Sequence, residues 1–230
     1  MAYQGQVPPC SAVSDLEHLG KAEDSGCIGI SLSTPYGDGD ESYQHIKLFM
    51  KGQTKSLSVI LPFFENLGLV VLSEQPFKLI GRDLYIFDFA VKLPQSDVLD
   101  DEATCSAFID LLKKLSLDEA ENDGFNRLCL LARLDVQCIN ILRAYGRYLR
   151  QAGLSFSQGY IERCLASHPQ IARLLSDLFE ARFVPNSSDA RAMETDDALR
   201  AALSKVSNPD DDRILSGYCT TLHATMRTNA

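Results

Sequence analysis

The sequence predicts an α+β protein in which a βαββα module precedes an all-helical domain. Runs typical of strands and helices alternate between residues 43 and 117, whereas no strand-like run follows Asn126. Residues 1–125 carry 20 acidic and 9 basic side chains, a balance of −11, whereas residues 126–230 carry 11 acidic and 13 basic ones, a balance of +2. The change in pattern and the change in charge together indicate a domain boundary near residue 121.

The first 26 residues are rich in Gly, Pro, Ser and acidic side chains and show little periodicity. We predict a poorly ordered segment over residues 1–26, followed by an α+β module over 27–120 and a helical domain over 121–230. Cys27–Leu32 is typical of a short strand, and residues 34–41 have the composition of a loop.

The module begins with a strand and a helix. His45–Lys51 predicts a strand, and apolar residues recur at helical spacing through Thr54–Leu67. Pro62 either kinks this helix or delays its start, and Gly68 is suited to the position after its last turn.

A hairpin and a second helix follow. Leu69–Ile80 and Leu84–Leu93 predict two strands, and Pro76 indicates a bulge or a sheet edge. Glu102–Leu117 then predicts a helix. This order is most of a ferredoxin-like split βαβ unit without its last strand. The sheet is therefore either incomplete or completed by the earlier strand Cys27–Leu32.

Beyond residue 126 every predicted element is a helix. Ser157 is a candidate N-cap and Pro169 a candidate first residue of a helix, and residues 184–188 have the composition of a linker. The predicted helices are Val136–Gln151, 158–167, 169–183, Asp189–Lys205 and Asp210–Thr228.

The stretch Glu121–Leu128 (ENDGFNRL) is polar and contains a glycine, yet it also carries Phe and Arg. We interpret it as a structured joint between the two modules, formed by Asn122, Asp123, Phe125, Asn126 and Arg127. The local alternative is that Asn122 or Asp123 caps a helix beginning near Gly124, with Phe125 packed in the core and Arg127 facing outward.

Arg143, Arg147 and Arg150 recur at helical spacing on one face of the predicted helix Val136–Gln151. Guanidinium groups at this spacing form a candidate docking face for a carboxylate or for another domain. The alternative is an ordinary solvated face with local ion pairs.

Composition excludes several classes of function. The net charge of −9 disfavours nucleic acids and anionic membranes as partners. We find neither a signal peptide nor an apolar run long enough to span a bilayer, so we expect a cytoplasmic protein. The seven cysteines lack CxxC spacing, which favours buried free thiols.

The sequence shows no pattern of catalytic or ligand-binding residues. The four histidines have no HExxH spacing, so we predict no metal site, and Gly37-Asp38-Gly39 is typical of a loop and not of a phosphate site. Clustered carboxylates at 100–102, 196–197 and 210–212 are explained by helix starts. We therefore assign no catalytic, cofactor-binding or metal-binding residue.

Several long motifs resemble one family when taken in order. They are PFFENLGLVVLSEQPF and YIFDF within residues 57–89, ENDGFNRL at 121–128, LRAYGRYLRQAGLSFSQGYIE at 142–162, HPQIARLLSDLFEARFVP at 168–185, DRIL at 212–215 and TMRTN at 225–229. Together they resemble the large, bacterial-type NAD-specific glutamate dehydrogenase. The resemblance covers residues 27–229, whereas residues 1–26 match poorly.

The resemblance implies a segment just upstream of a dehydrogenase core that oxidatively deaminates glutamate to 2-oxoglutarate and ammonia. It implies that residues 43–93 are an ACT-like module and that residues 122–229 are helices leading to the core. NAD is then the cofactor of the parent enzyme, and we expect this fragment to bind no cofactor and to be inactive alone. The implied partners are the catalytic domain or subunit, further copies of the chain and an amino-acid effector. The rival interpretations are a stand-alone amino-acid sensor and a protein-interaction scaffold.

Overall fold

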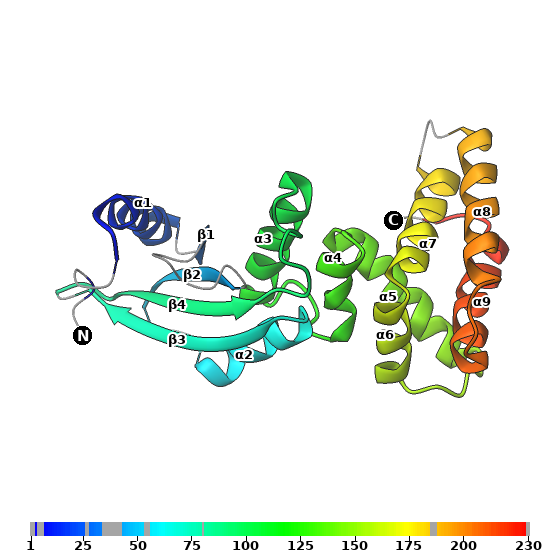
Figure 1. The fold of residues 1–230 in the computed structure, drawn as a ribbon, viewed down its shortest axis with the longest axis horizontal. Coiled ribbons are helices and arrows are strands. Elements are labelled where there is room, and N and C mark those ends of the chain that lie inside the picture. The colour runs from blue at the N-terminus through cyan, green and yellow to red at the C-terminus, as the bar shows by residue number, and fades with distance from the viewer. Residues whose placement is uncertain are drawn as a thin grey trace. The chain divides into compact units, whose positions relative to one another are not determined.

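The computed structural model describes residues 3, 7–25, 28–33, 43–52, 56–79, 81–184 and 188–228. They belong to two compact units, residues 1–122 and 123–230, whose elements are labelled in Figure 1. The predicted fold class is confirmed, because the first unit contains a four-stranded sheet and the regular elements described in the second unit are all helical. The predicted loop 34–41 lies outside the described residues, as do positions 185–187 of the predicted linker.

The sheet of the first unit is antiparallel throughout, with the strand order β1-β2-β4-β3. The strands are β1 (Gly29–Ser33), β2 (Gln44–Lys51), β3 (Val70–Lys78) and β4 (Leu84–Lys92). Strand β1 pairs with β2 from Gly29 opposite Phe49 to Ser33 opposite His45. The segment before the βαββα module therefore completes the sheet, which was one of the two predicted alternatives.

Strand β3 forms one edge of the sheet and is irregular. Val71 pairs with Val91 and Ser73 with Ala90, so Leu72 is an extra residue that forms a bulge. Pro76 lies further along the same strand, opposite Phe87. The prediction of an edge strand from Pro76 is confirmed, although the bulge lies four residues before the proline.

Helices cover both faces of the sheet (Figure 1). On one face α1 (Pro9–Ser25) packs Leu19 and Ala22 against Phe49 and Ile86. On the other face lie α2 (Leu57–Asn66) and α3 (Glu102–Ser116), whose Phe64 and Leu112 share an apolar cluster with Leu48, Met50 and Ile60. The first unit thus has three layers, with the sheet in the middle.

Local sequence accounts for the ends of α2 and α3. Pro62 lies inside α2, and Gly68 follows the helix with φ of 81°, a conformation that glycine adopts without strain. The carboxylate of Asp101 accepts a hydrogen bond from the backbone N–H of Thr104 and so caps α3.

The prediction of a poorly ordered N-terminal segment differs from the structure, since Pro9–Ser25 forms helix α1. The sequence did not predict this helix, because one residue of its buried face, Asp15, is charged. Asp15 is 4% exposed and pairs with Lys47 of β2, which is 1% exposed, with 2.5 Å between Oδ2 and Nζ. Tyr3 also donates a hydrogen bond to Asp15. A buried ion pair replaces an apolar contact here, so the hydrophobic periodicity is weak.

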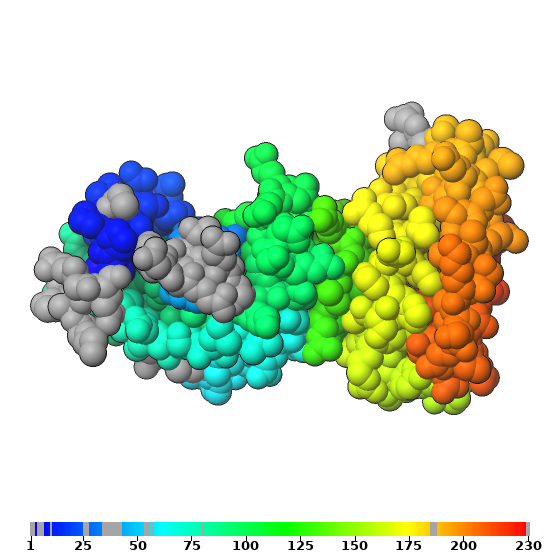
Figure 2. All heavy atoms as spheres, in the orientation of Figure 1, coloured from blue at the N-terminus to red at the C-terminus, as the bar shows by residue number. Residues whose placement is uncertain are grey.

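The second unit is a compact set of helices. A 3₁₀ helix, η2 (Gly124–Arg127), leads into α4 (Leu128–Leu131), α5 (Val136–Gln151), α6 (Gln158–Ser167), α7 (Pro169–Phe183), α8 (Asp189–Leu203) and α9 (Pro209–Ala224). Ser157 caps α6 and Pro169 begins α7, as predicted. In the space-filling view the side chains of α7 and α8 meet along the visible face (Figure 2).

The carboxylates at 196 and 197 require a correction. Asp196 and Asp197 lie in the interior of α8 and not at a helix start, so the helix dipole does not explain them. Asp196 instead accepts a hydrogen bond from Arg200, one turn later.

Across the part of the chain that the structure describes, no helix has both the length and the apolar character needed to cross a bilayer.

The buried ion pair below α1 leads to a first prediction. Replacing Lys47 by Met leaves the Asp15 carboxylate buried without its cation, so the free energy of unfolding of the first unit should fall by about 3–5 kcal/mol. Urea unfolding followed by circular dichroism measures this loss.

A matched control is available on the same helix. Arg82 contacts Glu23 of α1 at 2.9 Å, but the Arg82 side chain is 64% exposed, so Arg82→Met should cost no more than about 1 kcal/mol. Equal losses for Lys47→Met and Arg82→Met would contradict the role given to the buried pair.

Candidate functional site

Arg143 of α5 is the centre of a buried polar network at the start of the second unit. Its side chain is 3% exposed, and it grips the Asp123 carboxylate through two hydrogen bonds, Nε to Oδ2 at 2.8 Å and Nη2 to Oδ1 at 2.9 Å. Nη2 also donates to Oδ1 of Asn126 at 2.8 Å, and Nη1 donates to Asn140. The two-pronged contact matches the planar guanidinium to the planar carboxylate.

The same network fixes the short helix η2. Oδ1 of Asp123 accepts the backbone N–H of Phe125 at 3.2 Å, and Gln158 of α6 donates to Oδ2 at 3.4 Å. The guanidinium of Arg143 lies over the buried ring of Phe125, with 5.7 Å between Cζ of Arg143 and the ring centroid. One aspartate therefore connects η2, α5 and α6.

Gly146 of α5 allows the side chains of Tyr218 and Phe125 to pack directly against the helix backbone. A Cβ at this position would lie 2.5 Å from the hydroxyl of Tyr218 and 3.1 Å from the Phe125 ring. Tyr218 is fully buried on α9, and its hydroxyl donates a hydrogen bond to the backbone carbonyl oxygen of Leu142, with 3.0 Å between the two oxygens. The hydrogen bond and the glycine together bring α9 against α5.

The five residues predicted to form a joint do not all lie in one place in the structure. Asp123, Phe125 and Asn126 come together around Arg143 within the second unit. Asn122 belongs to the first unit, where its side-chain oxygen accepts a hydrogen bond from Asn66 at 3.0 Å. Arg127 is half-buried and does not face fully outward as the local alternative expected. The role of these five residues as a joint stays a prediction.

The predicted docking face also needs a correction. Arg143 does not belong to an exposed face with Arg147 and Arg150, because its guanidinium is enclosed by Asp123, Asn126 and Asn140. Arg147 and Arg150 are exposed, and docking through these two stays a prediction. A signal for the burial was present in the sequence, since Arg143 falls at helical spacing between the buried Ile139 and Gly146.

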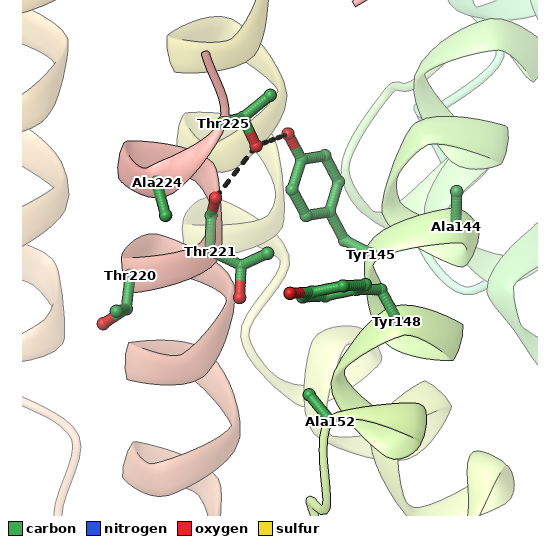
Figure 3. A pocket seen from close by; sticks show the side chains of 8 residues that line it. All are labelled: Ala144, Tyr145, Tyr148, Ala152, Thr220, Thr221, Ala224 and Thr225. Atoms are coloured by element: carbon green, nitrogen blue, oxygen red, sulfur yellow. Dashed lines mark hydrogen bonds between the residues drawn. The ribbon is translucent and has the colours of Figure 1, made fainter. Parts of the chain in front are cut away.

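An uncharged groove of about 610 Å³ lies between α5 and α9 (Figure 3). The rings of Tyr145 and Tyr148 point from α5 toward α9, and the Tyr145 hydroxyl lies 2.8 Å from Oγ1 of Thr225. The remaining lining residues are small or hydroxylated: Ala144, Ala152, Thr220, Thr221 and Ala224. The sequence could not show the groove, because the wall formed by α9 lies about 75 residues after the wall formed by α5.

The first unit contains a hollow of about 440 Å³ with a basic rim. His18 and Lys21 of α1 line it together with Lys113 of α3, and Gly29 and Ile30 of β1 form part of its wall. The His18 ring stacks on Phe49, and burial lowers the pKa of His18, as does the nearby Lys21. The two lysines therefore carry the positive charge of this hollow at neutral pH.

Five cysteines are free thiols. Cys129, Cys138, Cys164 and Cys219 are buried, and Cys105 is partly buried. Burial raises the pKa of Cys138 and of Cys164 to about 12, which keeps these two side chains protonated and unreactive at neutral pH.

Comparison with known families defines the class of this chain. Residues 28–104 match the ACT3 domain of glutamate dehydrogenase, and residues 120–185 match its helical motif 3. The first match covers the sheet and α2 of the first unit, and the second covers η2 and α4 to α7 of the second unit.

Whole-chain comparisons narrow the class to the NAD-specific enzymes. The chain is 35% identical to the NAD-specific glutamate dehydrogenase of Halomonas elongata over 232 residues, 36% identical to that of Pseudomonas aeruginosa over 236 and 34% identical to that of Mycobacterium tuberculosis over 241. Each alignment covers 99% of this chain and 14% of the relative. The resemblance to the NAD-specific glutamate dehydrogenases is therefore confirmed, and the chain spans about one seventh of the length of these relatives.

The network around Arg143 leads to a second prediction. Arg143→Met removes the cation and leaves the Asp123 carboxylate enclosed, so the second unit should lose about 3–5 kcal/mol of unfolding free energy. Arg150→Met, on the same helix but exposed, should cost about 1 kcal/mol or less. Urea unfolding of both variants measures these losses. If Arg143→Met lowers the unfolding free energy no more than Arg150→Met does, Arg143 is not the centre of a stabilising network.

Proposed function

We propose that this chain is a non-catalytic regulatory or assembly segment of an NAD-dependent glutamate dehydrogenase. The parent reaction is the oxidative deamination of L-glutamate to 2-oxoglutarate and ammonia with NAD. The observation that carries the proposal is the match of both units to an ACT domain and a helical motif of that enzyme. We assign NAD to the parent enzyme and no cofactor to this chain.

The architecture of the described sheet differs from that of a dinucleotide-binding domain, which supports a non-catalytic role in this proposal. Dinucleotides bind at the carboxyl ends of parallel strands, next to a glycine-rich turn that opens a helix. The pairings of the described sheet are all antiparallel, and helices cover both of its faces. In this proposal the segment lies upstream of the catalytic domain.

The partners in this proposal are the catalytic domain or subunit of the same enzyme and further copies of the chain. The exposed side chains of Arg147 and Arg150 offer cations to a partner carboxylate. We assign the chain to the cytoplasm, a reducing compartment that suits the free thiols of the described cysteines.

The third prediction tests the lack of catalysis and the assembly role. The purified chain, mixed with glutamate and NAD, should form no NADH above the rate without protein, whereas the full-length Pseudomonas aeruginosa relative serves as the positive control. Glutamate-dependent NADH formation by the chain would overturn the proposal.

An exchange of segments completes this test. When this chain replaces the similar segment of the Pseudomonas aeruginosa enzyme, the hybrid should assemble and remain active. Arg147→Glu together with Arg150→Glu should weaken that assembly in analytical ultracentrifugation, whereas Lys205→Glu, an exposed charge reversal just beyond the end of α8, should leave it unchanged. Unchanged assembly in the double variant would argue against this docking face.

The basic hollow of the first unit favours a second function, the binding of an amino-acid effector. Its volume of about 440 Å³ is in the range of small-molecule sites, and Lys21 and Lys113 provide positive charge for a carboxylate. The apolar wall at Ile28 and Ile30 suits the side chain of such a ligand.

Calorimetry against a panel of amino acids provides the fourth prediction. At least one amino acid should release or absorb heat on binding, and Lys113→Met should weaken that binding about tenfold or more, the loss expected for one charge-assisted hydrogen bond. Lys114→Met is the control, because Lys114 pairs with Asp110 and does not line the hollow. The absence of heat with every amino acid would exclude an amino-acid sensor.

A further inference from the structure

Three side chains with metal-binding atoms converge between α8 and α9. Cys219 and His223 lie one turn apart on α9, and Asp196 faces them from α8. One ligand atom from each of the three residues lies within 4.8 Å of the other two. The i, i+4 spacing places the thiol and the imidazole on one face of the helix.

The imidazole of His223 lies between the other two side chains. Nε2 of His223 lies 2.8 Å from Oδ1 of Asp196, and this oxygen is enclosed yet has no hydrogen-bond partner within the described residues. Sγ of Cys219 lies 3.7 Å from Nδ1 of the same imidazole. Each nitrogen of the ring therefore faces one of the other two potential ligands.

Arg200 holds the carboxylate in place. Its Nε donates to Oδ2 of Asp196 at 2.9 Å, which leaves Oδ1 as the oxygen that faces α9. Outer contacts of this kind orient the ligands of metal sites. The side chains of His223 and Asp196 are 35% and 19% exposed, so an ion can reach them from solvent.

We propose that Asp196, Cys219 and His223 form a binding site for a divalent transition metal, best suited to Zn²⁺. Sulfur and nitrogen ligands select such metals over Mg²⁺ and Ca²⁺, which require oxygen ligands. Tetrahedral zinc with bonds of about 2.0–2.3 Å separates its ligand atoms by about 3.3–3.7 Å. The 3.7 Å between Sγ of Cys219 and Nδ1 of His223 fits this geometry, and zinc binding requires the exposed imidazole to turn until one of its nitrogens faces both Cys219 and Asp196. Water supplies the fourth ligand.

The metal joins two helices of unequal burial. Leu199 is the buried residue of α8, whereas α9 buries Ile214, Leu215, Tyr218, Cys219 and Leu222. A metal that bridges Asp196 to α9 fixes α8 where apolar contacts are few. This site is independent of the proposed regulatory function. Its Cys-x₃-His spacing on one helix, with the third ligand on another, differs from HExxH and CxxC, so the sequence did not predict it.

Metal titration of the full chain tests the site and is the fifth prediction. After removal of metal with a chelator, the chain should bind one Zn²⁺. Co²⁺ in its place should give the visible bands of a tetrahedral ion and a thiolate-to-cobalt charge-transfer band. Cys219→Ser should abolish that charge-transfer band, and His223→Gln and Asp196→Asn should each weaken Zn²⁺ binding about tenfold or more.

Cys105→Ser is the matched control, since Cys105 is also a free and partly accessible thiol but lies on α3 of the first unit. It should leave binding unchanged. Zn²⁺ should also slow hydrogen exchange of the α8 amides in the wild-type chain but not in Asp196→Asn, whose fold is checked without metal by circular dichroism. No binding of Zn²⁺, or binding that Cys219→Ser leaves intact, would overturn the proposal.

Discussion

The helical unit depends on one buried charge, the guanidinium of Arg143. Moving a cation and a carboxylate out of water costs several kcal/mol, and the cost is recovered only when the geometry of the pair is good and the other polar atoms are satisfied. Here Nε, Nη1 and Nη2 all have acceptors, on Asp123, Asn126 and Asn140. Because these acceptors lie on η2 and α5, and Asp123 also contacts α6, the position of η2 is fixed by hydrogen-bond direction as well as by apolar packing.

The first unit uses the same device in a different setting. Lys47 of β2 and Asp15 of α1 are both almost fully buried, and their ion pair fixes the helix over one face of the sheet. Apolar contacts around Leu19 and Ala22 supply the burial, but they are compatible with small shifts of the helix along the sheet. A salt bridge is directional, so it selects one position among those that the apolar surface permits.

Most of the regular structure could be predicted from local sequence. Ser157 and Pro169 mark helix starts by their chemistry, and the strands β2 and β4 are apolar runs of the expected length. Helix α1 could not be predicted, because the burial of Asp15 is explained only once Lys47 lies opposite it.

The motifs of residues 121–185 predicted the glutamate dehydrogenase family without the structure, as the comparisons confirm. The partners of Arg143, the groove beside Tyr145 and the contact of Asp196 with His223 join residues far apart in sequence, so no local pattern shows them.

The bulge in β3 has a consequence for how copies of this chain meet. Val70 and Leu72 are 57% and 55% exposed on a sheet edge, and such an edge invites a strand of another molecule. The extra residue at Leu72 breaks the regular spacing of donors and acceptors that a partner strand needs, and Pro76 has no N–H to donate. The exposed apolar edge is thereby protected from the open-ended strand addition that leads to aggregates, so its hydrophobic side chains can remain at the surface.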